Sequence, residues 1–187
     1  VSTNGQNLDR EDVVEALLEA PPTYLIVAID GLTDQTNARY RVGAKLAPVL
    51  AGVRALAEAR RRRGQVLPLL HMRTIVMKHN EHELPRLEAF AGEHGFDLLT
   101  VRALAPIAEE SNAAAHEELL PELPEFRLYA YEEGARLRRD GFVCQEPFWF
   151  PSVYADGTVV ACVQDHNAER PLGSLADGRS FVDVWRS

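Results

Sequence analysis

The sequence predicts an α/β protein, built as a partial (β/α) barrel with a small C-terminal β-hairpin module. Over residues 1–103, short apolar runs alternate with amphipathic segments, which is typical of parallel strands joined by crossover helices. Farther along, Asp156-Gly157 lies between alternating apolar residues, the pattern of a tight hairpin. Right-handed crossovers would curl the parallel strands into part of a barrel and gather the loops that follow them on one face, where functional groups are expected.

Each element of the predicted barrel part has a start or stop signal. The apolar run at residues 24–29 is followed by Asp30-Gly31, and we expect residues 24–29 to form a parallel strand. Apolar residues recur at helical spacing from Leu46 until Gly64 ends the pattern. The sequence further predicts a helix at residues 8–20, a strand at residues 66–77 that is frayed at Pro68, and a strand at residues 97–101.

Asn80 and Glu83 have the spacing of an N-cap residue and its reciprocal acid. They predict a helix that runs from there to Gly95. His79 and His82 flank this helix start, and we expect both side chains in solvent. The histidines of the chain show no recognisable spacing of metal ligands.

The region between residues 104 and 141 lacks apolar periodicity. It is acidic and punctuated by Pro106, Pro121 and Pro124, so a linker or long excursion is expected, one that could shape a substrate cleft. The predicted domains are therefore residues 1–103, the linker at 104–141, and a C-terminal module at 142–187.

Composition excludes several classes of function. The 187 residues carry a formal net charge of −8, which disfavours binding to a phosphate backbone, so nucleic acid is not an expected partner. No apolar run is long enough for a membrane span. The two cysteines are too few for a disulfide framework, and we expect a reducing cytoplasm. The chain begins with Val1 close to its first element, which suggests a piece of a longer protein.

The C-terminal module combines several unusual residues in order. Cys144 and Cys162 bracket the predicted hairpin, Asp165 follows the second cysteine by three residues, and a Phe181-x-x-x-Trp185 pattern comes last. Singly, these are a turn, small core residues and a surface acid. Together they resemble the opening of a SPASM domain, the auxiliary iron–sulfur module of radical S-adenosylmethionine enzymes.

Two segments of the barrel part resemble the same family. Residues 3–5, Thr-Asn-Gly, resemble the sequence that ends a central barrel strand, and residues 28–31, Ala-Ile-Asp-Gly, resemble the Ser-Ile-Asp-Gly at the next strand end. Arg41 resembles the arginine that engages the methionine carboxylate of the cofactor, a contact that suits a guanidinium fork. The resemblance therefore implies S-adenosylmethionine binding by Asn4, Ala28, Asp30 and Arg41, cluster ligation by Cys144 and Cys162, and a catalytic acid or iron ligand at Asp165.

This chain departs from the family pattern in two places. Ala28 replaces a serine, which removes one hydrogen bond, worth on the order of 1 kcal/mol. The family's Cys-x-x-x-Cys-x-x-Cys is absent, and two cysteines cannot supply the three thiolates of the radical cluster. We therefore expect a fragment that is inactive alone and binds no cofactor, cut from a radical oxidoreductase or maturase. That parent would use S-adenosylmethionine, iron–sulfur clusters and an electron donor to abstract hydrogen from a peptide or small metabolite.

Other interpretations stay open at this stage. The chain fits a clusterless binding module that recognises a peptide or protein partner on a decayed barrel, and less well an unrelated barrel enzyme that uses Asp30 and a metal. The two thiols would be free or would hold an adventitious metal, with Asp165-His166 as possible zinc ligands. The aromatic residues of the module, Phe148, Trp149 and Trp185, are expected to pack in its core.

Overall fold

The computed structural model describes residues 1–104, 118–127, 131–132, 135–136, 143 and 145–187. The chain divides into two compact units, Val1–Leu137 and Arg138–Ser187, and each is described by itself. Among the described residues, no helix combines the length and the apolar character that crossing a bilayer requires.

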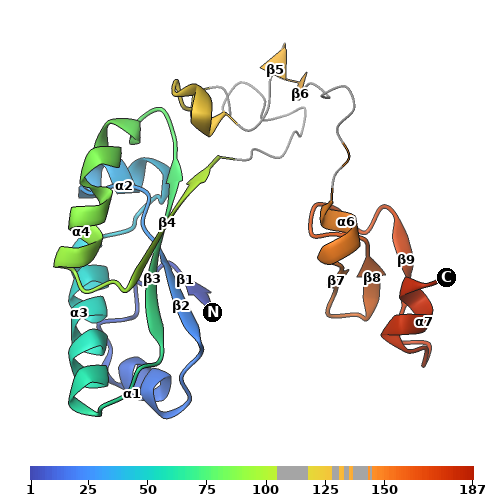
Figure 1. The fold of residues 1–187 in the computed structure, drawn as a ribbon, viewed down its shortest axis with the longest axis horizontal. Coiled ribbons are helices and arrows are strands. Elements are labelled where there is room, and N and C mark those ends of the chain that lie inside the picture. The colour runs from blue at the N-terminus through green and yellow to red at the C-terminus, as the bar shows by residue number, and fades with distance from the viewer. Residues whose placement is uncertain (105–117, 128–130, 133–134, 137–142, 144) are drawn as a thin grey trace. The chain divides into compact units, whose positions relative to one another are not determined.

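The first unit is built on a four-stranded parallel sheet with the strand order β1-β2-β3-β4 (Figure 1). The strands are β1 (Ser2–Thr3), β2 (Tyr24–Ala28), β3 (Leu69–Val76) and β4 (Leu98–Ala103). In register, Ile26 lies opposite both Ser2 and His71, and Met72 lies opposite Leu99. Neighbours in the sheet are thus neighbours in the chain, as in one sector of a (β/α) barrel, which confirms the predicted fold class.

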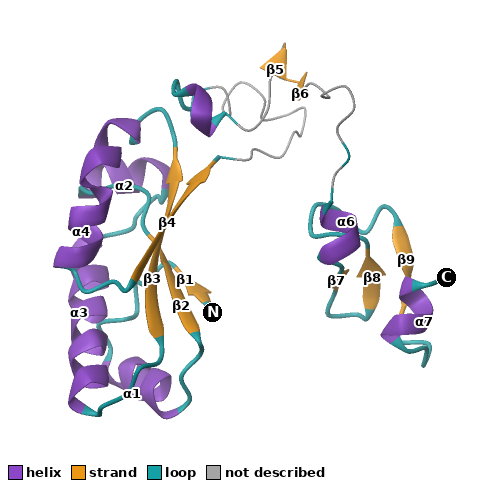
Figure 2. Cartoon of the chain, in the orientation of Figure 1, coloured by secondary structure: helices purple, strands orange, loops and turns teal. Residues whose placement is uncertain are grey.

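Helices cover one face of this sheet (Figure 2). They are α1 (Glu11–Glu19), α3 (Leu46–Arg62) and α4 (Leu87–Glu93), while α2 (Asp34–Tyr40) follows the end of β2. The apolar residues of α3 recur every three or four positions, so one stripe of the helix faces the strands. The resulting core contains residues of all three covering helices and of β2 and β3, among them Leu18, Val27, Val53, Leu56, Leu70, Met72 and Leu87.

Two elements begin later in the chain than the outer limits of the predicted ranges. The first helix begins at Glu11 rather than at residue 8, because Leu8 lies in a turn, with its N–H 3.0 Å from the carbonyl of Gly5. Leu8 is nevertheless buried against α3, where Gly52 makes room for its main chain. Strand β3 begins at Leu69, directly after Pro68, whose ring nitrogen has no N–H for strand pairing.

Asn80 is the N-cap residue of a helical segment, as predicted, but Asn80 and Glu83 do not form the predicted capping box. Asn80 makes no side-chain cap bond, and the segment after it is the 3-10 helix η1 (Glu81–Arg86), which contains Pro85 and leads into α4. Both side chains are buried and bind groups about fifty residues away instead. In this part of the chain, a capping box is formed by Thr33 and Thr36 at the start of α2.

Part of the predicted excursion packs on the barrel sector. Leu120 is buried against Met77 and Leu104, and the carboxylate of Glu81 accepts the N–H of Glu122 at 2.9 Å. The short helix η3 (Pro124–Phe126) and the hairpin of β5 (Tyr131–Glu132) and β6 (Ala135–Arg136) follow. The remainder of the predicted linker, including Pro106 and residues 105–117, lies outside the described residues.

The second unit contains a three-stranded antiparallel sheet with the order β7-β8-β9. Its elements are α6 (Glu146–Trp149), β7 (Ser152–Val153), β8 (Thr158–Val160), β9 (Pro171–Ser174) and α7 (Phe181–Trp185). The predicted hairpin is confirmed: β7 and β8 pair across the Asp156-Gly157 turn, and Gly157 has a φ of +87°, which a residue with a side chain rarely adopts. Val159, Val160 and Val184 are buried here.

An ion pair ties α3 to the loop before β4 and predicts acid sensitivity. Asp97 accepts two hydrogen bonds from Arg60, at 2.6 and 2.9 Å, and one from the main chain of Leu70 at 2.8 Å. Burial alone raises the pKa of Asp97, but the bonds from Arg60 and Leu70 outweigh it and hold the pKa below its ordinary value. A lowered folded-state pKa means that the stabilisation is present above the unfolded value of 3.8 and is lost as the pH falls through the folded value.

We therefore expect Asp97→Asn to lower the free energy of unfolding by about 1 kcal/mol at pH 7, a modest cost because the pair is partly exposed. The difference from wild type should shrink on acidification below pH 4, as followed by urea titration. Asp9→Asn, at an exposed carboxylate, is the matched control. A difference that stays constant between pH 7 and pH 3 would contradict the assignment.

Candidate functional site

The predicted cofactor residues of the first unit lie at the carboxyl ends of β1 and β2 and at the end of α2. Asn4 follows β1, Ala28 is the last residue of β2, Asp30 comes two residues later, and Arg41 is the C-cap residue that follows α2. The carboxyl ends of parallel strands share one edge of a sheet, and this edge carries the active site in barrel enzymes. The structure therefore brings Asp30 and Arg41 into contact and leaves Asn4 exposed on the neighbouring loop.

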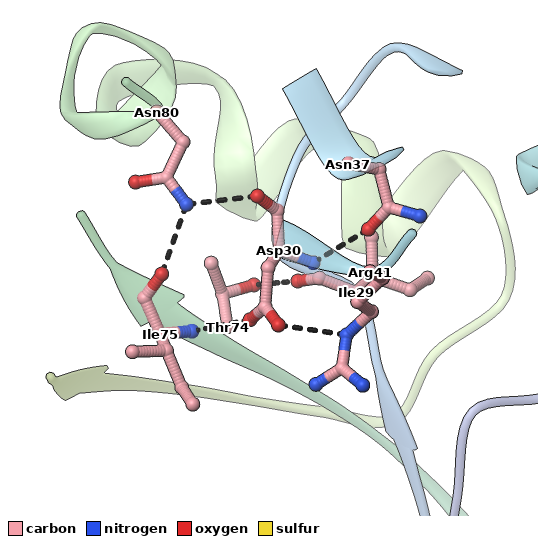
Figure 3. Close-up of polar contacts among 7 residues, drawn as sticks. All are labelled: Ile29, Asp30, Asn37, Arg41, Thr74, Ile75 and Asn80. Carbon is pink, nitrogen blue, oxygen red and sulfur yellow. Dashed lines mark hydrogen bonds and ion pairs between the residues drawn. The ribbon is translucent and has the colours of Figure 1, made fainter. Parts of the chain in front are cut away.

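Asp30 is the centre of a buried polar network (Figure 3). Its Oδ1 accepts the N–H of Ile75 at 2.7 Å, and its own N–H donates to Asn37 Oδ1 at 2.9 Å. Its carbonyl accepts a hydrogen bond from Asn80 Nδ2 at 2.8 Å. These bonds join the end of β2 to the end of β3 and to α2, so Asp30 fixes the edge of the sheet at this point.

The second oxygen of the Asp30 carboxylate faces Arg41. Arg41 Nε lies 2.7 Å from Asp30 Oδ2, and the two side chains are 23% and 0% exposed. The contact is a close charge pair, and among the described residues neither of these two buried atoms has a further hydrogen-bond partner. Burial raises the pKa of Asp30, and the N–H of Ile75 and the charge of Arg41 oppose that rise.

The guanidinium of Arg41 borders a pocket of about 340 Å³. In Figure 3 its two Nη atoms point away from Asp30, and among the described residues neither has a hydrogen-bond partner. The pocket is lined by Asn4, Gln6, Tyr40, Arg41, Val42, Gly43 and Ala44. Two of the four predicted cofactor residues therefore share one concavity, in which a guanidinium fork is available to an anion.

The loop that forms this pocket is held at both ends. Gln6 exchanges two hydrogen bonds of 3.1 Å with the main chain of Lys45, which joins the loop after β1 to the loop after α2. Asp34 Oδ1 accepts the N–H of Leu46 at 2.8 Å and so satisfies a free donor at the start of α3. The segment that carries Arg41 is thus tied to the loop after β1 and to the start of α3.

Sequence reasoning missed the polar side chains that build this edge. Asn37 and Asn80 bond the main chain of Asp30, while Glu83 accepts hydrogen bonds of 2.9 Å from the N–H of Leu32 and the hydroxyl of Thr36. An Asn and a Glu three residues apart have the spacing of a local cap, and that spacing does not indicate their distant partners.

The prediction for the two neighbouring histidines is half right. His82 is exposed, as expected. His79 is not in solvent: both of its ring nitrogens are buried without a hydrogen-bond partner. Burial, with the charge of Arg39 as a further cause, lowers the pKa of His79, so the ring is neutral at pH 7.

In the second unit, Asp165 organises the loop between β8 and β9. Its Oδ1 accepts the N–H of Glu169 at 2.8 Å, its Oδ2 accepts the N–H of Arg170 at 3.0 Å, and its carbonyl accepts the hydroxyl of Tyr154. Among the described residues, each carboxylate oxygen accepts a single hydrogen bond and could accept a second. The main-chain N–H groups of Glu169 and Arg170 therefore hold the carboxylate of Asp165 in a fixed position within the loop.

Of the two predicted cluster ligands, Cys162 is among the described residues. Cys162 is half-buried in the loop after β8 and forms no disulfide with another described residue. Cys144 lies outside the described residues. Within the part of the chain that the structure describes, no three or more His, Cys, Asp or Glu side chains gather closely enough to hold a metal ion.

The aromatic residues at the start of this unit are on its surface. Phe148, Trp149 and Phe150 are 65%, 71% and 62% exposed, so the core position predicted for Phe148 and Trp149 is wrong. Helix α6 is only four residues long, and the buried residues of the unit come from β8 and α7 instead. Trp185 is half-buried and stacks on Phe181, with ring centroids 6.0 Å apart.

The fold and its polar edge define an α/β protein with one sector of a (β/α) barrel and a small antiparallel sheet. No family model and no curated protein matches the sequence. The structure is similar to Streptococcus suis SuiB bound to S-adenosylmethionine, with a TM-score of 0.64 and 13% identity, and to SuiB bound to the precursor peptide SuiA, with a TM-score of 0.61 and 12% identity. Each match covers 100% of this chain and 47% of SuiB, so the chain spans about half the length of that protein. At this identity the likeness is one of fold.

Proposed function

We propose that this chain is part of a radical S-adenosylmethionine oxidoreductase or maturase that abstracts hydrogen from a peptide or a small metabolite. Residues 1–103 would be the rear part of its barrel, residues 104–141 a connecting region, and residues 142–187 the start of a SPASM-type module. The fold likeness to SuiB, solved with S-adenosylmethionine and with a precursor peptide, supports this proposal. So does the position of residues 3–5 and 28–31 at two neighbouring strand ends.

The observation that carries the proposal is the Asp30–Arg41 pair beside the pocket. The residues present fit the amino-acid end of S-adenosylmethionine, because Arg41 offers a guanidinium fork to a carboxylate and Asn4 lines the same concavity. Asp30 uses its two oxygens on Ile75 and Arg41, so its proposed role is to orient Arg41. Ala28 would contribute only main-chain contact.

The cysteines fit the radical cluster poorly, because that cluster needs three thiolates and this chain has two cysteines. We propose that Cys144 and Cys162 instead belong to an auxiliary cluster, and that residues 1–187 are inactive alone. S-adenosylmethionine would supply the radical chemistry in the whole protein. This chain's residues would bind and orient it, with Asp165 as acceptor of a substrate proton.

The test is to express the extended reading frame, reconstitute iron and sulfide anaerobically, and measure 5′-deoxyadenosine after reduction. We expect cleavage, and we expect Arg41→Leu to weaken S-adenosylmethionine binding by about tenfold or more, the value of one lost charged contact. Arg61→Leu, at an exposed position on α3, should bind as wild type does. Asp165→Asn should lower substrate turnover more than deoxyadenosine formation.

Absence of both a cluster and cleavage in the extended protein would contradict the proposal. That outcome would favour the alternative, a clusterless module that recognises a peptide or protein partner on the barrel sector.

A further inference from the structure

The face of the parallel sheet opposite the helices carries a distinct set of side chains, which we call the open face. Along β3, residues alternate between buried and half-buried, and the half-buried ones include His71, Arg73 and Ile75. On β4, Leu99 and Val101 pack into the helix-covered core, so Thr100 and Arg102 project to the other side. The hydrogen bond of 2.7 Å between His71 Nε2 and Thr100 Oγ1 joins the two strands across this face. No described helix of the first unit covers it (Figure 2).

The charges on the open face are all of one sign. In register, Arg73 lies opposite Thr100 and Ile75 lies opposite Arg102, so the two arginines occupy diagonal positions on adjacent strands. Strands β2, β3 and β4 contain no aspartate or glutamate. Among the described residues neither arginine has an ion-pair partner, although the whole chain carries a net charge of −8.

Arg73 is the better defined of the two. Its Nε is removed from solvent and has no hydrogen-bond partner in the described part of the chain. Burial lowers the pKa of the nearby His71, and the positive charge of Arg73 lowers it further. The imidazole is therefore not expected to add a second positive charge beside Arg73 at pH 7. A half-buried guanidinium with an unsatisfied donor is costly unless an acceptor is supplied from elsewhere.

We propose that the open face binds an acidic peptide, one carboxylate of which is held between Arg73 and Arg102. This inference rests on the proposed function and narrows its substrate class to peptides that carry a glutamate or aspartate near the reacting residue. Register places Arg73 opposite Ala28, two residues before Asp30, so the peptide would lie beside the Arg41 pocket. The carboxylate would be shared by the guanidinium groups of Arg73 and Arg102, while Arg41 remains free for the cofactor.

The experiment uses the 187-residue chain and follows the arginine side-chain N–H signals by NMR. The probes are a blocked pentapeptide with two glutamates, the same peptide with two glutamines, and S-adenosylmethionine alone. We expect the glutamate peptide to shift the signals of Arg73 and Arg102 and to bind at least about tenfold more tightly than the glutamine peptide. The double variant Arg73→Gln/Arg102→Gln should lose this preference, and the exposed control Arg61→Gln should keep it.

Because the double variant alters a sheet, Arg73→Lys/Arg102→Lys serves as a second variant that keeps the charge, and both are checked by circular dichroism. The lysine variant should retain part of the preference for glutamate.

Equal binding of the two peptides, or a preference that survives in the folded glutamine variant, overturns the inference. Shifts of Arg73 and Arg102 on addition of S-adenosylmethionine would also overturn it, since the carboxylate would then be that of the cofactor. None of these outcomes depends on a cluster, so they are separate from failure of cofactor cleavage in the extended protein.

Discussion

Replacing Asp30 by alanine is expected to lower the free energy of unfolding of the first unit by about 3 kcal/mol, the lower end of the range for breaking a buried ion pair. The variant leaves the N–H of Ile75 without its acceptor and Arg41 Nε without its counter-ion. Arg41 is 23% exposed and can recover some hydration, which is why we expect the lower end of the range. Urea unfolding followed by far-ultraviolet circular dichroism measures the loss.

Asp30→Asn separates the charge from the hydrogen bond. The amide oxygen of asparagine can still accept the N–H of Ile75, so this variant should lose less stability than the alanine variant. Because burial raises the pKa of Asp30, the folded state holds its proton more tightly than the unfolded state does. The contribution of Asp30 is then greatest below the unfolded value of 3.8 and declines as the pH rises through the folded value.

As the pH rises from the unfolded-state pKa of Asp30 through its folded-state pKa, the free energy of unfolding of wild type should fall relative to that of Asp30→Asn. For Asp97 we expect the opposite, since wild type gains stability over Asp97→Asn as the pH rises. The exposed variant Asp9→Asn is again the control. An alanine variant as stable as wild type would mean that Asp30 is free for a ligand and does not hold the edge of the sheet.

The elements that the sequence predicted well are those whose signal is local and repeated. The strand at residues 24–29 and the helix from Leu46 to Gly64 each depend on a run of apolar residues with one period, and packing reinforces that period. The hairpin at Asp156-Gly157 depends on the conformational freedom of one glycine. The parallel order of the sheet follows from connection lengths and handedness.

The polar edge of the sheet could not be predicted, because its partners are far apart in the chain. Asn80 and Glu83 satisfy the local pattern of a cap, yet Asn80 bonds the carbonyl of Asp30 and Glu83 bonds the N–H of Leu32. A buried acceptor with a distant donor outweighs the local preference. Asp30 and Arg41 were both chosen as cofactor residues from sequence, but nothing in the sequence indicated that they pair with each other.

The exposure of Phe148 and Trp149 in the second unit could not be predicted from the sequence either. Aromatic residues are usually buried, and Phe148 and Trp149 follow a proline in a short apolar run. The strands of the unit are two to four residues long, so their faces are too small to bury every aromatic side chain.

Gly31→Ala is expected to have the second large effect, because this glycine has almost no space around it. A Cβ atom at position 31 would lie 2.4 Å from the main-chain nitrogen of Asn37 and 2.6 Å from the carbonyl carbon of Thr36. Both are backbone atoms of α2, so the helix itself must move. Overpacking of this kind costs about 1–3 kcal/mol and sometimes more, and we expect about 3 kcal/mol since no flexible side chain can yield.

The displacement should also reach the pocket, because α2 carries Asn37, which bonds Asp30, and is followed by Arg41 as its C-cap residue. Gly31→Ala is therefore expected to weaken binding of S-adenosylmethionine in the extended protein beyond what its stability loss explains. Gly92→Ala is the matched control, since nothing lies within 4 Å of its added Cβ and alanine is favoured in a helix such as α4 by about 1 kcal/mol. If the two alanine variants were equally stable, the close approach of α2 to the end of β2 would be wrong, and with it the geometry that places Arg41 beside Asp30.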